Sequence, residues 1–333
     1  GGAWGGVLWR CLSGAKMRER KLGRSDVDGS VVGLGTWAMG DDFFGKVDDQ
    51  HSIGAIQSAI DSGVNLIDTA PAYGAGHAEE VVGKAIKGRR EEVVIATKVG
   101  IVRTPTSFDR NLKPESIRKE IDDSLRRLGV DVIDLYQIHW PDPDTPLEDS
   151  LEELVKIRDA GKFRYLGVSN FDTTLMEQAQ EQAGIVSLQP QFSLLVRDAE
   201  EELLPYCVEK NFGVLSYGTL AGGILTGKFK EIPQLPKGDN RDKFYKFFKE
   251  PEWTAIQGLL EVIRMVAEEH GVTPAQVSTR WAIQQPGITT ALVGAKNGDQ
   301  AAANAKAGEF ELESGDLDRI EEAYRRTLGT VAQ

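Results

Sequence analysis

The run VVIATK at residues 93–98 is typical of a strand buried on both faces, because four apolar residues follow one another before the polar pair Thr97 and Lys98. A strand with one face in water would instead alternate apolar and polar residues. Seven further runs are similarly rich in valine, isoleucine and leucine, at residues 31–35, 64–69, 132–139, 165–169, 186–191, 213–217 and 289–294. Stretches with helical periodicity separate these runs, so the chain is predicted to form repeated βαβ units with parallel strands.

The predicted helices carry start and stop signals that agree with this division. Pro114 opens an amphipathic stretch that Gly129 closes. Residues 145–148 and 273–276 each supply a threonine for the cap, a proline for the first turn, and the Glu or Gln that completes a capping box. Local signals that agree with the strand pattern support the segmentation.

Eight successive units favour a closed (β/α)8 barrel of the TIM type over an open doubly wound sheet. Polar residues end nearly all the strands; in a barrel those ends meet at one mouth, whereas an open sheet uses only its switch point. Asp28-Gly29 is a hairpin-turn signal, and we expect a hairpin there to close the bottom of the barrel. Residues 235–253, which are polar and aromatic, are expected to form a long loop over the mouth after the seventh strand, with extra helices following it.

The chain of 333 residues is expected to hold a single barrel domain at residues 17–333. Because Met17 resembles a natural start, residues 1–16 are interpreted as an N-terminal leader or extension outside the fold. No uninterrupted apolar stretch reaches about 18 residues, and the two cysteines suggest no disulfide framework. These features predict a cytoplasmic protein with no membrane partner.

The charge balance argues against nucleic acid as a partner. The formal net charge is -12, from 39 Lys plus Arg against 51 Asp plus Glu. Such a field repels phosphate backbones and anionic membranes, although a local basic pocket can still bind one anionic ligand. We expect a monomer or a small homo-oligomer, because no self-complementary apolar stripe stands out.

Four polar side chains that the barrel would bring to one rim could together protonate a carbonyl oxygen: Asp68, Tyr73, Lys98 and His139. A phenol has a pKa of about 10, and a nearby ammonium group makes it a better proton donor. Lys98 could supply that charge, Asp68 could hold the lysine, and His139 could orient the carbonyl. Each residue alone would more often be structural, but their coincidence at one rim favours catalysis. The hydride must come from a cofactor.

Four blocks strongly resemble the aldo-keto reductase superfamily: DTAPAYG at 68–74, ATK at 96–98, DLYQIH at 134–139 and GVSNF at 167–171. Their order and spacing also match, over nearly the whole chain outside the leader. The resemblance implies an NADP(H)-dependent oxidoreductase that reversibly reduces aldehydes, ketones or sugar carbonyls to alcohols, with Tyr73 as the general acid. The spacing of the GAK block at 294–296 and the long loop after the seventh strand are similar to those of the bacterial-type branch, which is related to potassium-channel β subunits.

The resemblance also implies which residues bind the cofactor. Ser169, Asn170 and Gln191 would bind the nicotinamide carboxamide, and Tyr217 would stack on the ring. Lys296, beside a helix start near Asn297, would meet a 2'-phosphate, which favours NADP(H) over NAD(H). The other implied contacts lie at the strand ends, in the segment that would cover the pyrophosphate, and at the adenosine end: Gly35, Thr36, Trp37, Asp68, Gly218, Leu220, Gly222, Gly227, Lys228, Arg241, Gly294, Gln300 and Asn304.

The substrate is expected to be a small carbonyl compound bound between Trp37, Tyr73, His139 and Trp140. Two alternatives differ in chemistry. One is a barrel aldolase in which Lys98 forms a Schiff base. The other is a cofactor-binding redox sensor or channel-associated subunit with little turnover. No metal site is expected, because the four histidines form no paired motif.

Overall fold

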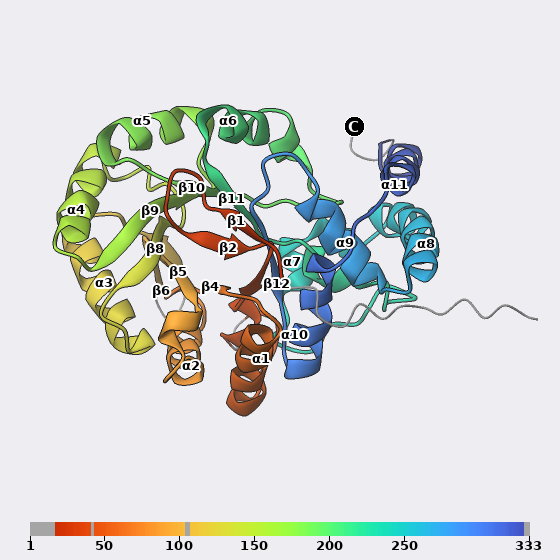
Figure 1. The fold of residues 1–333 in the computed structure, drawn as a ribbon, viewed down its shortest axis with the longest axis horizontal. Helices are drawn as coiled ribbons and strands as arrows, with labels where there is room; N and C mark the ends of the chain where they lie inside the picture. The colour runs from red at the N-terminus through yellow and green to blue at the C-terminus, as the bar shows by residue number, and fades with distance from the viewer. Residues whose placement is uncertain (1–16, 41–42, 104–106, 330–333) are drawn as a thin grey trace, which may run out of the picture.

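A closed barrel of eight parallel strands forms the centre of the computed structural model, which describes residues 17–40, 43–103 and 107–329 (Figure 1). Each strand pairs with the next along the chain, and the last pairs with the first through Ala291 and Val32. The strands are β3 (Val32–Gly35), β4 (Leu66–Asp68), β5 (Val94–Val99), β8 (Ile133–Ile138), β9 (Phe163–Ser169), β10 (Ser187–Gln189), β11 (Gly213–Ser216) and β12 (Thr290–Gly294). The predicted (β/α)8 barrel is confirmed, and every strand overlaps a predicted run. The predicted leader, residues 1–16, lies outside the described residues.

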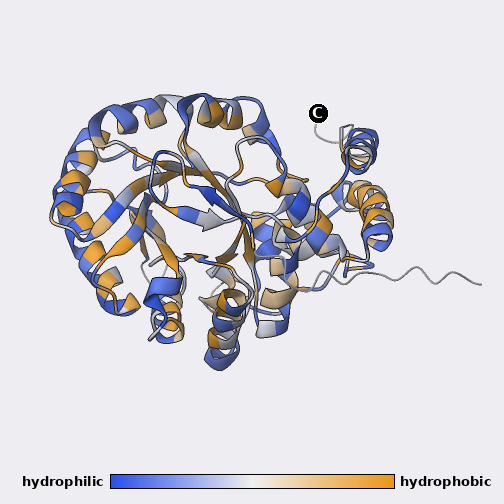
Figure 2. Cartoon of the chain, in the orientation of Figure 1, coloured by the Kyte–Doolittle hydropathy of each residue, from blue (hydrophilic) through white to orange (hydrophobic). Residues whose placement is uncertain are grey.

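Helices surround the barrel, and Figure 2 shows hydrophobic and hydrophilic residues on different sides of them. The layer around the strands consists of α1 (Asp49–Asp61), α2 (His77–Ala85), α3 (Pro114–Leu128), α4 (Leu147–Asp159), α5 (Thr173–Ala183), α6 (Leu203–Lys210), α9 (Pro274–Ile283) and α10 (Gly298–Ala305). The extra helices are α7 (Arg241–Phe244), α8 (Glu252–His270) and α11 (Ser314–Thr327). Within the described part of the chain, no helix combines the length and apolar character needed to cross a membrane. The cytoplasmic location and the oligomeric state stay predictions.

The helix caps match the sequence signals in two of three cases. Gly129 ends α3 in the left-handed conformation, and Thr273 forms the expected capping box with Gln276 at α9. The box expected at residues 145–148 is wrong, because the Thr145 hydroxyl donates to Asp142 and α4 begins without a side-chain cap.

The core has two layers, and strand alternation decides which side chains enter the barrel. On β5, Val94 and Ala96 pack with the apolar cluster inside the barrel, whereas Ile95 and Val99 pack against the helices. Because successive side chains of a strand point to opposite faces, Lys98 follows Ala96 into the interior. The same alternation places Asp68 above Leu66 on β4, and these two polar residues therefore meet at the carboxyl ends of neighbouring strands.

A hairpin closes the amino end of the barrel, as expected, but its turn lies elsewhere. Strands β1 (Glu19–Lys21) and β2 (Asp28–Ser30) pair so that Asp28 and Gly29 face Lys21 and Arg20. The turn is therefore residues 22–27, and the prediction of a turn at Asp28-Gly29 is wrong. Leu22 and Val27 from this six-residue turn pack into the interior cluster of the barrel.

Two loops build the opposite end, the mouth. After β11, the expected long loop crosses the mouth, where Asp239 forms a β-bridge with Phe44 and the Asn240 amide donates to the Phe43 carbonyl at 2.8 Å. A second hairpin, β6 (Ile101–Arg103) with β7 (Phe108–Arg110), follows β5 and was not predicted. Both loops contribute walls to the site described next.

Candidate active site

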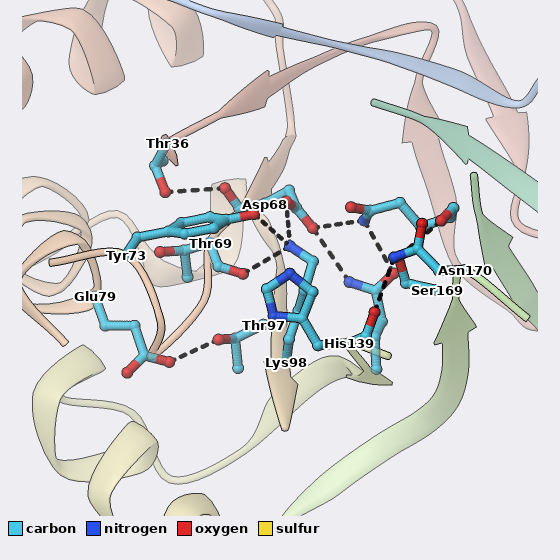
Figure 3. Close-up of polar contacts among 12 residues, drawn as sticks. Thr36, Asp68, Thr69, Tyr73, Glu79, Thr97, Lys98, His139, Ser169 and Asn170 are labelled. Carbon is cyan, nitrogen blue, oxygen red and sulfur yellow. Dashed lines mark hydrogen bonds and ion pairs between the residues drawn. The ribbon is translucent and has the colours of Figure 1, made fainter. Parts of the chain in front are cut away.

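Three of the four predicted catalytic residues are in contact, because buried Lys98 lies between Asp68 and Tyr73 (Figure 3). The Lys98 ammonium donates to Asp68 Oδ2 at 2.6 Å, to the Thr69 carbonyl at 3.0 Å and to the Tyr73 hydroxyl at 3.2 Å. The Lys98 side chain is only 1% exposed. Each of its three N–H groups therefore has a partner, and the lysine is fixed beside the phenol oxygen.

Tyr73 reaches the mouth from the tight loop that follows β4. Gly74 makes this loop possible: its φ is +64°, and an added Cβ would lie 2.2 Å from the Gly40 carbonyl oxygen. The Tyr73 ring stacks on Trp37 with centroids 6.2 Å apart and meets the His139 ring edge-on at 6.0 Å. The structure thus brings Tyr73 and His139 to the same side of the mouth.

Burial sets the protonation states of the site. It raises the pKa of Tyr73 well above its usual value, and the neighbouring Asp68 carboxylate raises it further. The shift is upward, not the lowering that Lys98 was expected to cause, and the phenol keeps its proton. Burial also lowers the pKa of Lys98 and, together with Lys98, holds the pKa of His139 well below its usual value. His139 is therefore neutral and can donate a hydrogen bond without becoming a charged acid.

Two glutamines with no role predicted from the sequence bind the second oxygen of Asp68. Gln137 of β8 and Gln189 of β10 donate to Asp68 Oδ1 at 3.1 and 2.8 Å. Gln189 also donates to Gln137 Oε1 at 3.1 Å. Both glutamines are at most 2% exposed. The sequence signal that could have found Gln137 is a lone amide inside the apolar strand run of residues 132–139.

The residues predicted to bind a nicotinamide lie close to one another. Asn170 Nδ2 donates to Ser169 Oγ and to the His139 carbonyl, both at 3.0 Å, and the Tyr217 hydroxyl donates to Asn170 Oδ1 at 2.9 Å. Gln189, whose backbone pairs in register with Ser169, lines the pocket with Asn170 and Tyr217. Gln191 does not line the pocket and pairs with Tyr217 beyond the end of β10. Gln189 is therefore a further candidate for the carboxamide contact, and the role of Gln191 stays a prediction.

A pocket of about 520 Å³ opens above these residues. All four predicted substrate contacts line it, and Phe108 and Phe244 form its outer walls with 58% and 40% of their surfaces exposed. The complete lining is Trp37, Phe43, Ala72, Tyr73, Ile101, Arg103, Phe108, His139, Trp140, Asn170, Gln189, Tyr217, Asn240, Lys243 and Phe244. The pocket is thus an aromatic chamber with the phenol and imidazole at its inner end.

Three cations gather beside this pocket around one carboxylate. Arg241 pairs with Asp239 at 2.7 Å and donates to the Gly222 carbonyl at 2.7 Å, and Lys296 Nζ donates to the Phe44 carbonyl at 2.7 Å. Burial and the Arg241 charge lower the pKa of both Lys228 and Lys296. The excess of positive charge fits an anionic group such as a phosphate.

Several other residues predicted to bind the cofactor form hydrogen bonds with the backbone near these cations. Helix α10 begins beside Lys296, where Asn297 is its cap, as expected. Gln300 Oε1 accepts from the Lys296 amide at 2.9 Å, and Asn304 Nδ2 donates to the Gly294 carbonyl at 3.1 Å. The remaining predicted residues lie at the end of β3 or in the segment after β11: Gly35, Thr36, Gly218, Leu220, Gly222 and Gly227.

Glu120 of α3 anchors the start of the β6–β7 hairpin, and we expect it to make stability depend on pH. Its carboxyl accepts from the Gly100 amide and the Ser116 hydroxyl, both at 3.1 Å, and burial raises its pKa from 4.5 to about 7. The folded state therefore favours the protonated acid. The stability that protonated Glu120 contributes to the folded state is complete below about pH 4.5 and is lost as the pH rises through about 7.

Glu120→Gln is therefore expected to stabilise the protein by about 1–3 kcal/mol at pH ~8 and to change little at pH ~5. Urea unfolding at both pH values measures the difference. Glu115→Gln, an exposed change on the same helix, is the control. An equal effect of Glu120→Gln at both pH values would show that the carboxyl does not titrate with folding.

The chain is similar in sequence and in fold to known proteins. Residues 31–325 match the model of the Aldo/keto reductase family. Aldo-keto reductase YhdN of Bacillus subtilis is 37% identical over 314 residues, which cover 94% of this chain and 95% of that protein. The solved structure of the glycerol dehydrogenase AKR11B4 from Gluconobacter oxydans is 37% identical, covers 93% of this chain and 95% of its own, and has a TM-score of 0.85.

Two further relatives differ in what their names describe. The NADH-specific methylglyoxal reductase of Escherichia coli is 34% identical over 322 residues, covering 92% of this chain and 98% of that protein. A putative voltage-gated potassium channel subunit beta of Schizosaccharomyces pombe is 32% identical over 307 residues, covering 87% of this chain and 88% of that protein.

Proposed function

Because this chain belongs to the aldo/keto reductase family, in the branch that the sequence predicted, we propose that it is an NADP(H)-dependent reductase of aldehydes, ketones or sugar carbonyls. A nicotinamide cofactor and general carbonyl reduction follow from the family. The preference for NADP(H), the residue roles and the substrate class are the proposal. The observation that carries it is the contact of buried Lys98 with Asp68 and Tyr73 at the inner end of the pocket.

Each catalytic side chain has a distinct task in this proposal. Tyr73 donates its phenolic proton to the carbonyl oxygen as the carbonyl carbon receives the hydride that the reduced cofactor supplies when bound. Neutral His139 donates a hydrogen bond to the same oxygen and orients it. Lys98 stabilises the phenolate that forms, and Asp68 compensates the lysine charge at 2.6 Å.

The residues around the pocket fit a nicotinamide dinucleotide at both of its ends. Ser169, Asn170 and Gln189 offer amide and hydroxyl groups beside the Tyr217 ring, which suits a carboxamide and an aromatic face. Lys228, Arg241 and Lys296 suit phosphate groups, and the neighbouring Asp239 carboxylate pairs with Arg241. These residues would hold the cofactor while Tyr73 faces the substrate.

The contacts of Lys98 argue against the aldolase alternative. A Schiff base needs a lysine amine that a substrate carbonyl can reach. Lys98 is 1% exposed and its ammonium donates to three protein oxygens. The sensor alternative keeps one specific support, the similarity to a putative channel subunit, and it differs from the proposal in turnover rate.

The proposal is tested by measuring oxidation of reduced cofactor, through the absorbance of the reduced nicotinamide, with a panel of aldehydes, ketones and sugars. The panel includes methylglyoxal, and glycerol with oxidised cofactor in the reverse direction, since relatives are named for these compounds. We expect steady turnover with NADPH. Tight cofactor binding with only one slow turnover per chain would instead favour the sensor.

Lys296 is expected to decide between the two cofactors. Lys296→Ala removes a half-buried cation beside the start of α10 and should weaken NADPH binding by about 10- to 100-fold, because charge-assisted hydrogen bonds contribute about 1.5–3 kcal/mol. NADH, which lacks the 2'-phosphate, should bind as before. Dissociation constants from quenching of protein fluorescence measure both, with exposed Lys306→Ala as the control. Equal weakening for both cofactors would contradict the 2'-phosphate assignment.

A further inference from the structure

The amide contacts of Asp68 fix the orientation of both glutamines. An ionised carboxylate only accepts hydrogen bonds, so Gln137 and Gln189 must each turn Nε2, not Oε1, toward Asp68 Oδ1. Gln189 Nε2 has two hydrogens, and its second one goes to Gln137 Oε1 at 3.1 Å. Gln137 Oε1 therefore accepts the second N–H of Gln189, so both N–H groups of that amide have partners.

This arrangement leaves the Gln189 carbonyl as the group that faces the pocket. Gln189 lines the pocket, and among the described residues its Oε1 has no hydrogen-bond partner. A carbonyl oxygen is an acceptor, and the matching ligand group is an N–H donor such as the NH2 of a carboxamide. If Gln189 turned over, it would present NH2 to the pocket and an oxygen to the Asp68 carboxylate, which would repel it.

We propose that Gln137 is a positioning residue that holds the Gln189 carbonyl toward the nicotinamide carboxamide and, through the same amide, fixes Asp68 against Lys98. The inference rests on the proposed function, and it adds a residue that is 0% exposed and is not among the residues that line the pocket. In this proposal one chain of hydrogen bonds, from Gln189 through Asp68 to Lys98, connects the cofactor site to the Asp68–Lys98 ion pair.

The test compares two ligands, NADP+ and adenosine 2',5'-bisphosphate, which is the same molecule without its nicotinamide half. Gln137→Leu keeps the volume of the side chain but removes both hydrogen bonds. We expect it to weaken NADP+ binding about tenfold and to leave binding of the bisphosphate unchanged, as measured by calorimetry. A purely structural role would weaken both ligands together. Gln180→Leu, a half-buried change on the outer helix α5, is the matched control.

Two further variants test the route of the effect. Because Gln137 acts on the cofactor through Gln189, the double variant Gln137→Leu/Gln189→Leu should bind NADP+ no more weakly than Gln189→Leu alone. Gln137→Glu can donate to Asp68 only while its carboxyl keeps a proton. Its NADP+ defect should therefore be small at about pH 6 and grow toward about pH 9, with no such trend for the bisphosphate.

The inference and the proposed function can fail separately. A wild-type chain that turns over carbonyls while Gln137→Leu keeps the wild-type ratio of NADP+ to bisphosphate affinity overturns the inference alone. Additive losses in the double variant also overturn it. A wild-type chain that binds NADP+ no better than the bisphosphate overturns the inference, and absent turnover then also refutes the proposed reductase.

Discussion

Tyr73→Phe is expected to lower kcat for carbonyl reduction by about 100- to 10,000-fold, the range associated with a positioned general acid. The change removes one oxygen atom and leaves the ring contacts with Trp37 and His139 in place. Because burial and Asp68 raise the pKa of Tyr73, the wild-type phenol is protonated at neutral pH and ready to donate. The variant has no proton to give.

The loss should appear in kcat and not in cofactor affinity. NADPH binding measured by fluorescence should therefore agree with wild type, because the Tyr73 hydroxyl contacts Lys98 at 3.2 Å and none of the residues proposed to bind the cofactor. Tyr245→Phe provides a control at a second buried tyrosine, which packs in the loop over the mouth. Equal activity of Tyr73→Phe and wild type would refute Tyr73 as the acid and require another proton source.

The barrel was predictable because its physical requirements leave local marks in the chain. Parallel strands buried on both faces produce uninterrupted apolar runs, and their carboxyl ends carry the polar residues that face the mouth. The β6–β7 hairpin gives no such pattern in the sequence, because its two strands are only three residues long. Asp28-Gly29 has the composition of a turn, but the pairing of Lys21 with Asp28 places it within a strand.

The residues proposed as catalytic could be assigned to one rim of the barrel from the sequence, whereas the glutamines around Asp68 could not. Alternation along a strand shows that Lys98 and Ala96 share a face, so the chain reveals which side chains enter the barrel. It does not reveal their height relative to the next strand, which depends on the stagger of the closed barrel. That register sets Gln189 level with Ser169 and leaves Gln191 beyond the strand. The sequence alone therefore could not show which of Gln189 and Gln191 lines the pocket.

Lys98→Met is expected to have the second large effect, on activity and on stability together. The side chain is nearly the same length, but the Asp68 carboxylate, 4% exposed, loses its charged partner and keeps only the Gln137 and Gln189 amides. Removing one member of a buried ion pair costs about 3–5 kcal/mol, because the other charge stays buried without compensation. We also expect kcat to fall at least about 100-fold, since the Tyr73 phenolate forms without the ammonium.

The pH dependence of unfolding separates this electrostatic cost from a packing defect. An uncompensated carboxylate can take up a proton, so the stability deficit of Lys98→Met in urea should shrink as the pH falls, whereas a packing defect would not change. Lys84→Met, which removes an exposed lysine 3.7 Å from Asp49, should change stability by less than about 0.5 kcal/mol. The double variant Asp68→Asn/Lys98→Met retains an acceptor for the two glutamines and should regain most of the lost stability but none of the activity. Recovery of activity in that variant would mean that the ion pair stabilises the barrel without assisting proton transfer.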